Sequence, residues 1–132
     1  MKIPKTGAEI CFVVKDCIKA LELYESIFDA ARVEVTGEPA GLNEAVFTVF
    51  GTRFHMLDEN PEYFLIAPVE GDPKTVWFNI FVSDINAVFN KVTDAGCVII
   101  QPVKEAEGVN AYNAMFCDPF GYIWMLHQAK DD

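Results

Sequence analysis

The feature of this sequence that most constrains its fold is an internal repeat. Residues 9–16 (EICFVVKD) and 77–84 (WFNIFVSD) are both strand-like runs that end in aspartate, and a helical pattern follows each. The apolar positions of these patterns recur at helical spacing. They are Ala20, Leu21, Tyr24, Ile27 and Phe28 in the first, and Ile85, Val88, Phe89, Val92 and Ala95 in the second. The chain is therefore predicted to contain two similar modules.

Both predicted helices carry end signals. Asp16 and Asp84 stand where an N-cap carboxylate accepts hydrogen bonds from the amides of the first helical turn. Gly96 follows the second helix, at a position where a left-handed C-cap favours glycine. We therefore expect the helices to begin after the two aspartates, and the second to end just before Gly96.

Three strand candidates follow each helix. They are residues 32–38, 44–51 and 53–59 in the first half, and 97–104, 112–117 and 122–128 in the second. The sequence thus predicts an α+β fold of paired βαβββ modules, with two curled mixed sheets and one helix each. The modules span about residues 9–59 and 75–128, and the irregular linker 60–74 is rich in proline and glycine. A four-stranded sheet with one helix leaves a face uncovered, so residues 1–132 are expected to form a single domain.

The charge balance and the cysteines limit the partners and the compartment. Ten basic and twenty acidic residues give a net charge of −10, which disfavours nucleic acids and anionic membrane surfaces as partners. No apolar run reaches the length of about 18 residues that a membrane span requires. The four cysteines lack CxxC spacing and lie among apolar neighbours, which indicates free thiols in a reducing compartment. We therefore expect a cytoplasmic protein.

Strand alternation predicts which residues lie on the face that each helix leaves open. Apolar residues such as Phe12 and Phe78 are expected to face the helices. The residues expected to line a groove on the open faces are Glu9, Met56, Trp77, Asn79 and Met125. The alternative is that this lining is a second core. Strand alternation does not decide on which face Tyr112 and Asn113 lie. His127 is expected at the surface near a strand end.

The repeated modules and the turn at residues 118–124 (DPFGYIW) resemble the vicinal oxygen chelate superfamily. This superfamily includes glyoxalase I, extradiol dioxygenases, and the bleomycin- and fosfomycin-resistance proteins. The Asp-Pro-Phe-Gly form of the turn, together with Met56, is most similar to the PhnB-like branch, often labelled demethylubiquinone methyltransferase-like. The resemblance covers about residues 9–128 and implies the glyoxalase fold and a homodimer.

The resemblance also implies where a metal would bind, because metal-using members take one ligand from each of four strands. The matching positions here are Glu9, Met56, Trp77 and Met125. Only the glutamate offers a donor that divalent ions prefer, since thioethers suit soft ions and Trp has no lone pair to give. A one-residue shift in the fourth strand would bring His55 beside Glu9, and two ligands still fall short. We therefore expect no metal and no cofactor.

The sequence then favours a small-molecule binding or sequestering protein with an apolar or aromatic groove. Its ligand-binding residues would be Glu9, Met56, Trp77, Asn79 and Met125. The alternative is a lyase, isomerase or dioxygenase of the vicinal oxygen chelate type. Glu9 would then be a metal ligand, or a general base if an apolar groove raised its pKa. A third hypothesis is a scaffold whose groove is filled by its own side chains.

Overall fold

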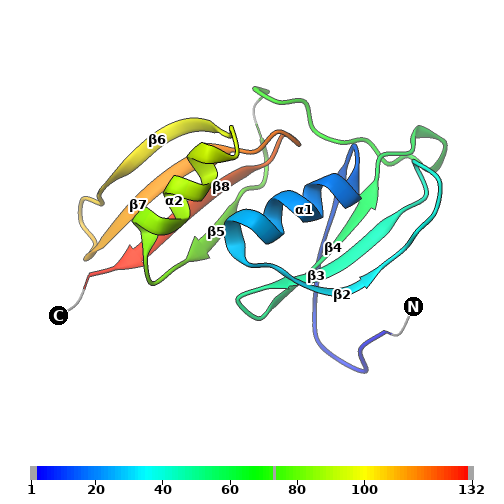
Figure 1. Ribbon diagram of the computed structural model, residues 1–132, viewed down its shortest axis with the longest axis horizontal. Helices are drawn as coiled ribbons and strands as arrows, with labels where there is room; N and C mark the ends of the chain where they lie inside the picture. Colours follow the sequence, from blue (N-terminus) through cyan, green and yellow to red (C-terminus); the bar gives the residue numbers. More distant parts are fainter. Residues whose placement is uncertain (1–2, 73, 131–132) are drawn as a thin grey trace. The chain divides into compact units, whose positions relative to one another are not determined.

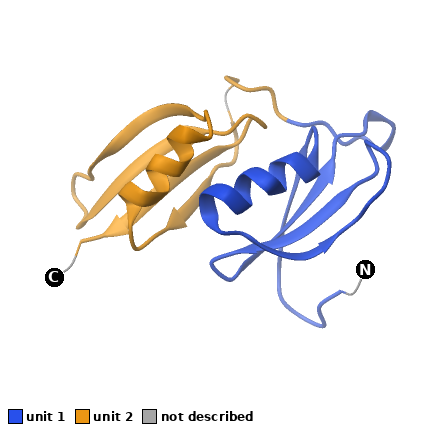
Figure 2. Ribbon diagram, viewed as in Figure 1, with its two compact units in different colours: residues 1–67 blue, residues 68–132 orange. Residues whose placement is uncertain are grey.

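The computed structural model describes residues 3–72 and 74–130 (Figure 1). The chain divides into two compact units, residues 1–67 and 68–132 (Figure 2). The boundary falls inside the predicted linker. That linker also contains a short 3₁₀ helix, η1 (Pro61–Tyr63), and a bridge between Asn60 and Leu65.

Unit 1 is a four-stranded mixed sheet with one helix. Its elements are β1 (Ile10–Val14), α1 (Cys17–Phe28), β2 (Ala31–Val35), β3 (Glu44–Val49) and β4 (Thr52–Asp58). The strand order is β1-β4-β3-β2, with β1 parallel to β4 and the remaining pairs antiparallel. The helix α1 lies across one face of this sheet (Figure 1).

Unit 2 repeats this topology. Its elements are β5 (Phe78–Phe81), α2 (Ile85–Asp94), β6 (Val98–Glu105), β7 (Ala111–Cys117) and β8 (Ile123–Ala129). The order β5-β8-β7-β6 matches that of unit 1, and β5 is parallel to β8. The prediction of paired βαβββ modules in an α+β fold is thereby confirmed. Within residues 3–72 and 74–130, neither α-helix is long and apolar enough to cross a membrane.

The predicted helix ends are also confirmed. The Asp16 side chain accepts a hydrogen bond from the Lys19 amide, and the Asp84 side chain accepts one from the Ala87 amide. Gly96 has a φ of 80°, and its amide donates to the carbonyl of Thr93. These contacts satisfy backbone groups that a helix end otherwise leaves without partners.

The core of unit 1 is a cluster of aromatic rings between α1 and its sheet. Phe47 stacks on Phe54 at a centroid distance of 5.4 Å and on Tyr24 of α1 at 5.9 Å. Phe12 meets Phe54 edge-on at 6.0 Å. All four side chains are buried, and burying each one stabilises the fold by about 1.5–3 kcal/mol. This packing fixes which face of the sheet lies under the helix.

The Asp-Pro-Phe-Gly turn is built around a buried aspartate. Asp118 accepts hydrogen bonds from the backbone amides of Phe120 and Tyr122, and its Oδ2 accepts one from the Trp124 indole at 2.7 Å. Asp118 and Trp124 are both fully buried. The turn therefore anchors the largest side chain of the unit 2 core at the start of β8.

Candidate functional site

The face of the unit 1 sheet that α1 leaves open carries a polar cluster of four side chains. These are Glu9, Glu44, Arg53 and His55. The strand register explains why these four side chains lie together. His55 of β4 pairs with Cys11 of β1 and with Val46 of β3, and Glu9 and Glu44 lie two residues before these partners. Paired residues share a face, so alternate residues of three strands converge there.

Met56 does not lie on this face, so the prediction that it lines the groove is wrong. Its side chain is fully buried, and its pairing with Phe12 places it on the face under α1. In strands, a shift of one residue moves a side chain to the opposite face. The position on the open face belongs instead to His55.

A one-residue offset between the last strands of the two modules explains the wrong prediction. Both last strands contain a Met-Leu pair, at residues 56–57 and 125–126, which suggests that Met56 matches Met125. The observed registers pair Ile10 with Phe54 and Phe78 with Trp124. The repeat therefore makes His55 the counterpart of Met125, one residue away from the sequence match.

The polar cluster is a chain of ion pairs and hydrogen bonds. Arg53 donates from Nε to Glu9 Oε2 at 2.6 Å. The two ring nitrogens of His55 lie 2.9 Å from Glu9 Oε1 and 2.8 Å from Glu44 Oε1. Ionised carboxylates only accept hydrogen bonds, so both contacts form together when the imidazole carries two protons. The histidine thus bridges two acidic groups.

The environment of Glu9 favours its ionised form. The hydrogen bond from Arg53, followed by that from His55, holds the pKa of Glu9 below its ordinary value of 4.5, against a smaller opposing effect of burial. A raised pKa, which the general-base hypothesis needed, is therefore not what the structure gives. Glu9 acts in this cluster as an anion that contacts both Arg53 and His55.

A cavity of about 320 Å³ adjoins the polar cluster. Its lining consists of Glu9, Arg53 and His55 together with the N-terminal segment, residues 3–8. The volume lies at the lower end of the range of about 300–1,000 Å³ typical of small-molecule sites. Sequence reasoning missed Arg53, although its position two residues before His55 places it on the same strand face.

The open face of the unit 2 sheet carries the other predicted site residues. Asn79 pairs with Met125 across β5 and β8, as the predicted faces require. Trp77, just before β5, is 54% exposed. Asn79 also contacts His127, whose Nε2 lies 3.0 Å from the Asn79 Oδ1 atom.

His127 and Phe81 extend this open face beyond the predicted set. Their rings stack at a centroid distance of 5.2 Å, and Phe81 is 73% exposed. Burial lowers the pKa of His127 below its ordinary value of 6.5, so the ring is predominantly neutral at neutral pH. Asn113 pairs with His127 and joins this face. Tyr112, one residue earlier, lies on the opposite face, beneath the Lys130 ammonium.

The residues at the four positions that the resemblance implies do not suit a divalent metal ion. With the corrected register these positions hold Glu9 and His55 in unit 1, and Trp77 and Met125 in unit 2. Catalytic zinc takes three protein ligands from nitrogen, oxygen or thiolate donors, and the second pair offers an indole and a thioether. Among the residues that the structure describes, no group of three His, Cys, Asp or Glu side chains could hold a metal.

Comparison with known protein families agrees with this architecture. The Glyoxalase/Bleomycin resistance protein/Dioxygenase superfamily matches residues 8–126. The chain belongs to this superfamily. The match includes both modules, from the residue before Glu9 to the middle of β8. A comparison with curated protein sequences finds no match.

Solved structures with the same fold include three proteins of different names. FosX, a fosfomycin resistance protein from Listeria monocytogenes, has a TM-score of 0.71 and 14% identity over 97% of this chain and 96% of its own. A putative 3-demethylubiquinone-9 3-methyltransferase, the PhnB protein of Bacillus cereus, has a TM-score of 0.71 and 18% identity over 94% and 100%. TioX from Micromonospora sp. ML1 has a TM-score of 0.67 and 17% identity over 96% and 98%. At these identities the likeness concerns the fold.

Proposed function

We propose that this member of the superfamily is a metal-free small-molecule binding or sequestering protein. The observation that carries the proposal is the cavity of about 320 Å³ beside Glu9, Arg53 and His55. The cavity combines an apolar wall with a few charged groups, which is the composition typical of small-molecule sites. In this cavity the ligand-binding residues are Glu9, Arg53 and His55. The predicted residues Trp77, Asn79 and Met125 belong to unit 2, where we propose them separately as a binding surface on the open face of its sheet.

The donor chemistry supports binding rather than metal-assisted catalysis. A resident divalent ion would compete with Arg53 for Glu9 and would have to displace a carboxylate from either ring nitrogen of His55. The positions held by Trp77 and Met125 add no hard donor. A role for Glu9 as a general base also loses support, because its pKa is lowered.

The proposal extends to assembly and location. We expect a cytoplasmic homodimer, as the resemblance to the superfamily implies. The net charge of −10 supports partners other than nucleic acids and anionic membranes. Size-exclusion chromatography with light scattering measures the assembly directly, and a monomer at micromolar concentration would contradict the dimer.

Ligand binding by metal-stripped protein tests the central proposal. The purified chain is treated with a chelator, checked by elemental analysis, and screened against a library of small aromatic and aliphatic compounds by NMR. We expect binding that persists without metal and that shifts the ring signals of His55. Binding that appears only after one equivalent of Mn²⁺, Zn²⁺, Ni²⁺ or Fe²⁺ is restored would overturn the metal-free proposal. A screen with no binding at all would overturn the binding function.

A further inference from the structure

Two arginines of unit 1 pair with glutamates in different ways. Arg32 uses Nε and Nη2 to contact both oxygens of Glu25, each at 2.9 Å, so one whole edge of its guanidinium is engaged. Arg53 contacts Glu9 through Nε alone. Within residues 3–72 and 74–130, its two terminal amino groups have no hydrogen-bond acceptor. The end of the Arg53 guanidinium is therefore available to a ligand.

Arg53 is also the less exposed of the two. Its side chain is 22% exposed, whereas that of Arg32 is 48% exposed. No fully buried side-chain nitrogen or oxygen in the described part of the chain lacks a partner. The terminal amino groups of Arg53 must therefore keep some access to solvent, and Arg53 lines the cavity of about 320 Å³. A partly desolvated guanidinium that opens onto a cavity favours an acceptor of matching geometry.

We propose that this cavity binds a small organic anion, a carboxylate with a short apolar body, through the two terminal amino groups of Arg53. The inference rests on the proposed binding function and names the ligand class. Two parallel N–H···O bonds match the spacing of a carboxylate. Ile3, Pro4 and Ala8 also line the cavity and supply the apolar contact for the body of the ligand.

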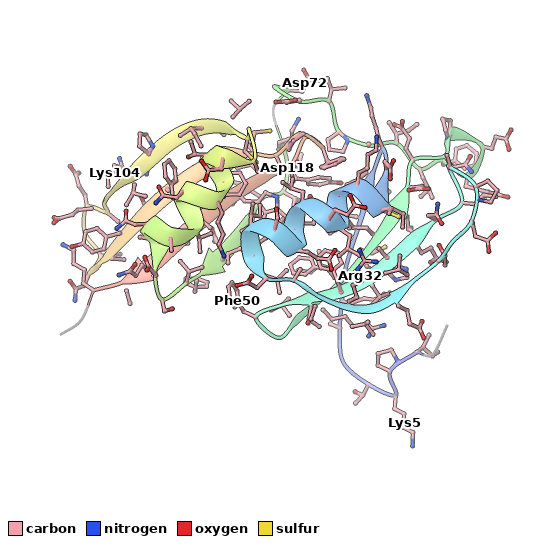
Figure 3. All side chains as sticks on the ribbon, in the orientation of Figure 1. Lys5, Arg32, Phe50, Asp72, Lys104 and Asp118 are labelled. Carbon is pink, nitrogen blue, oxygen red and sulfur yellow. The ribbon has the colours of Figure 1, made fainter. Side chains whose placement is uncertain are left out.

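The charges around the cavity agree with this class. Glu9 holds the Nε edge of Arg53 and so fixes the guanidinium without covering its far end. Glu44, the second acid of the polar cluster, is not part of the cavity lining. Lys5 lines the cavity, but its side chain extends away from the sheet (Figure 3), so we assign the recognition to Arg53 alone.

Benzoate is a suitable probe, with benzamide as its uncharged counterpart and inorganic phosphate as an anion without an apolar body. The chain has two histidines, so each ring signal can be assigned with one variant, His127→Gln. We expect benzoate to shift the His55 ring signals in a saturable way and to leave those of His127 unchanged. Benzamide and phosphate are expected to bind at least about tenfold more weakly than benzoate. Benzamide lacks the negative charge that pairs with Arg53, and phosphate lacks the apolar body.

Three variants connect the effect to the guanidinium. Arg53→Gln removes the charge and should weaken benzoate binding at least about tenfold. Arg53→Lys keeps the charge without the fork and should weaken it by a smaller factor. Arg32→Gln is the matched control, since it removes an arginine–glutamate pair from the same unit, and should bind as the natural chain does. Thermal melting of all three verifies that they are folded.

The outcomes separate this inference from the proposed function. If metal-stripped protein binds neutral compounds at His55 while benzoate binds no better than benzamide, the anion class is wrong and the binding function stands. Equal benzoate affinity in Arg53→Gln and the natural chain would also overturn the inference. If the library screen and all three probes fail to bind, the proposed function fails with it.

Discussion

The Nδ1 atom of His55 lies 2.9 Å from the Oε1 atom of Glu9, although 46 residues separate them in the chain. The parallel pairing of β1 with β4 brings the two together, since Cys11 is the direct partner of His55. The contact places a histidine at the position where the sequence suggested a methionine. The open face of the unit 1 sheet is therefore charged and polar here, where the sequence predicted an apolar groove lining.

The corrected register predicts different roles for Met56 and Met125. Met56→Ala should lower the free energy of unfolding by about 2–5 kcal/mol, because the side chain is fully buried under α1. Met125→Ala should cost less, since its side chain is partly exposed on the open face. Urea denaturation of both variants gives the comparison. A Met56→Ala protein as stable as the natural chain would contradict the assigned face.

Gly121 is expected to be far less tolerant of substitution than Gly51. Both have positive φ, 92° and 86°, so alanine is strained at either position. A Cβ atom at Gly121 would lie 2.7 Å from the backbone oxygen of Pro68, whereas nothing lies within 4 Å at Gly51. Gly51→Ala should cost about 1–2 kcal/mol and Gly121→Ala distinctly more. Equal losses in chemical denaturation would mean that the turn and Pro68 can move apart.

The contribution of Asp58 to the stability of the fold should be lost in acid. Burial alone would raise its pKa, but hydrogen bonds from the backbone amides of Cys17, Asn43 and Gly41 outweigh it and hold the pKa below the ordinary 3.8. A lowered pKa contributes stability above the unfolded value, and this stability is lost as pH falls through the folded value. The loss should therefore begin near pH 4 and continue below it.

The variant Asp58→Asn isolates this contribution, because asparagine does not titrate. Unfolding midpoints in urea, measured from pH 7 down to pH 3, should show the variant less stable at pH 7. The gap to the natural chain should narrow as the medium becomes more acidic. A gap that stays constant across this range would show that the ionisation of Asp58 does not contribute to stability.

Much of the fold follows from local patterns. Asp16 and Asp84 mark the helix starts because a short carboxylate reaches the amides of the first turn. The sequence indicates the turn at Asp118. It does not reveal what stabilises that turn, which is the hydrogen bond that the Trp124 indole donates to the Asp118 carboxylate. That bond depends on how the turn and β8 meet in space.

The sequence by itself determined the repeat, the order of helices and strands, and the family. These rest on the spacing of residues close together in the chain. Only the tertiary structure decided which face of β4 lies under α1. Phe54 and Met56 lie on one face of this strand and His55 and Leu57 on the other, and both faces carry at least one apolar side chain. Either face could therefore lie under the helix. Packing against Phe12 and Phe47 resolves the choice, and with it the placement of Glu9, Arg53 and His55 around one cavity.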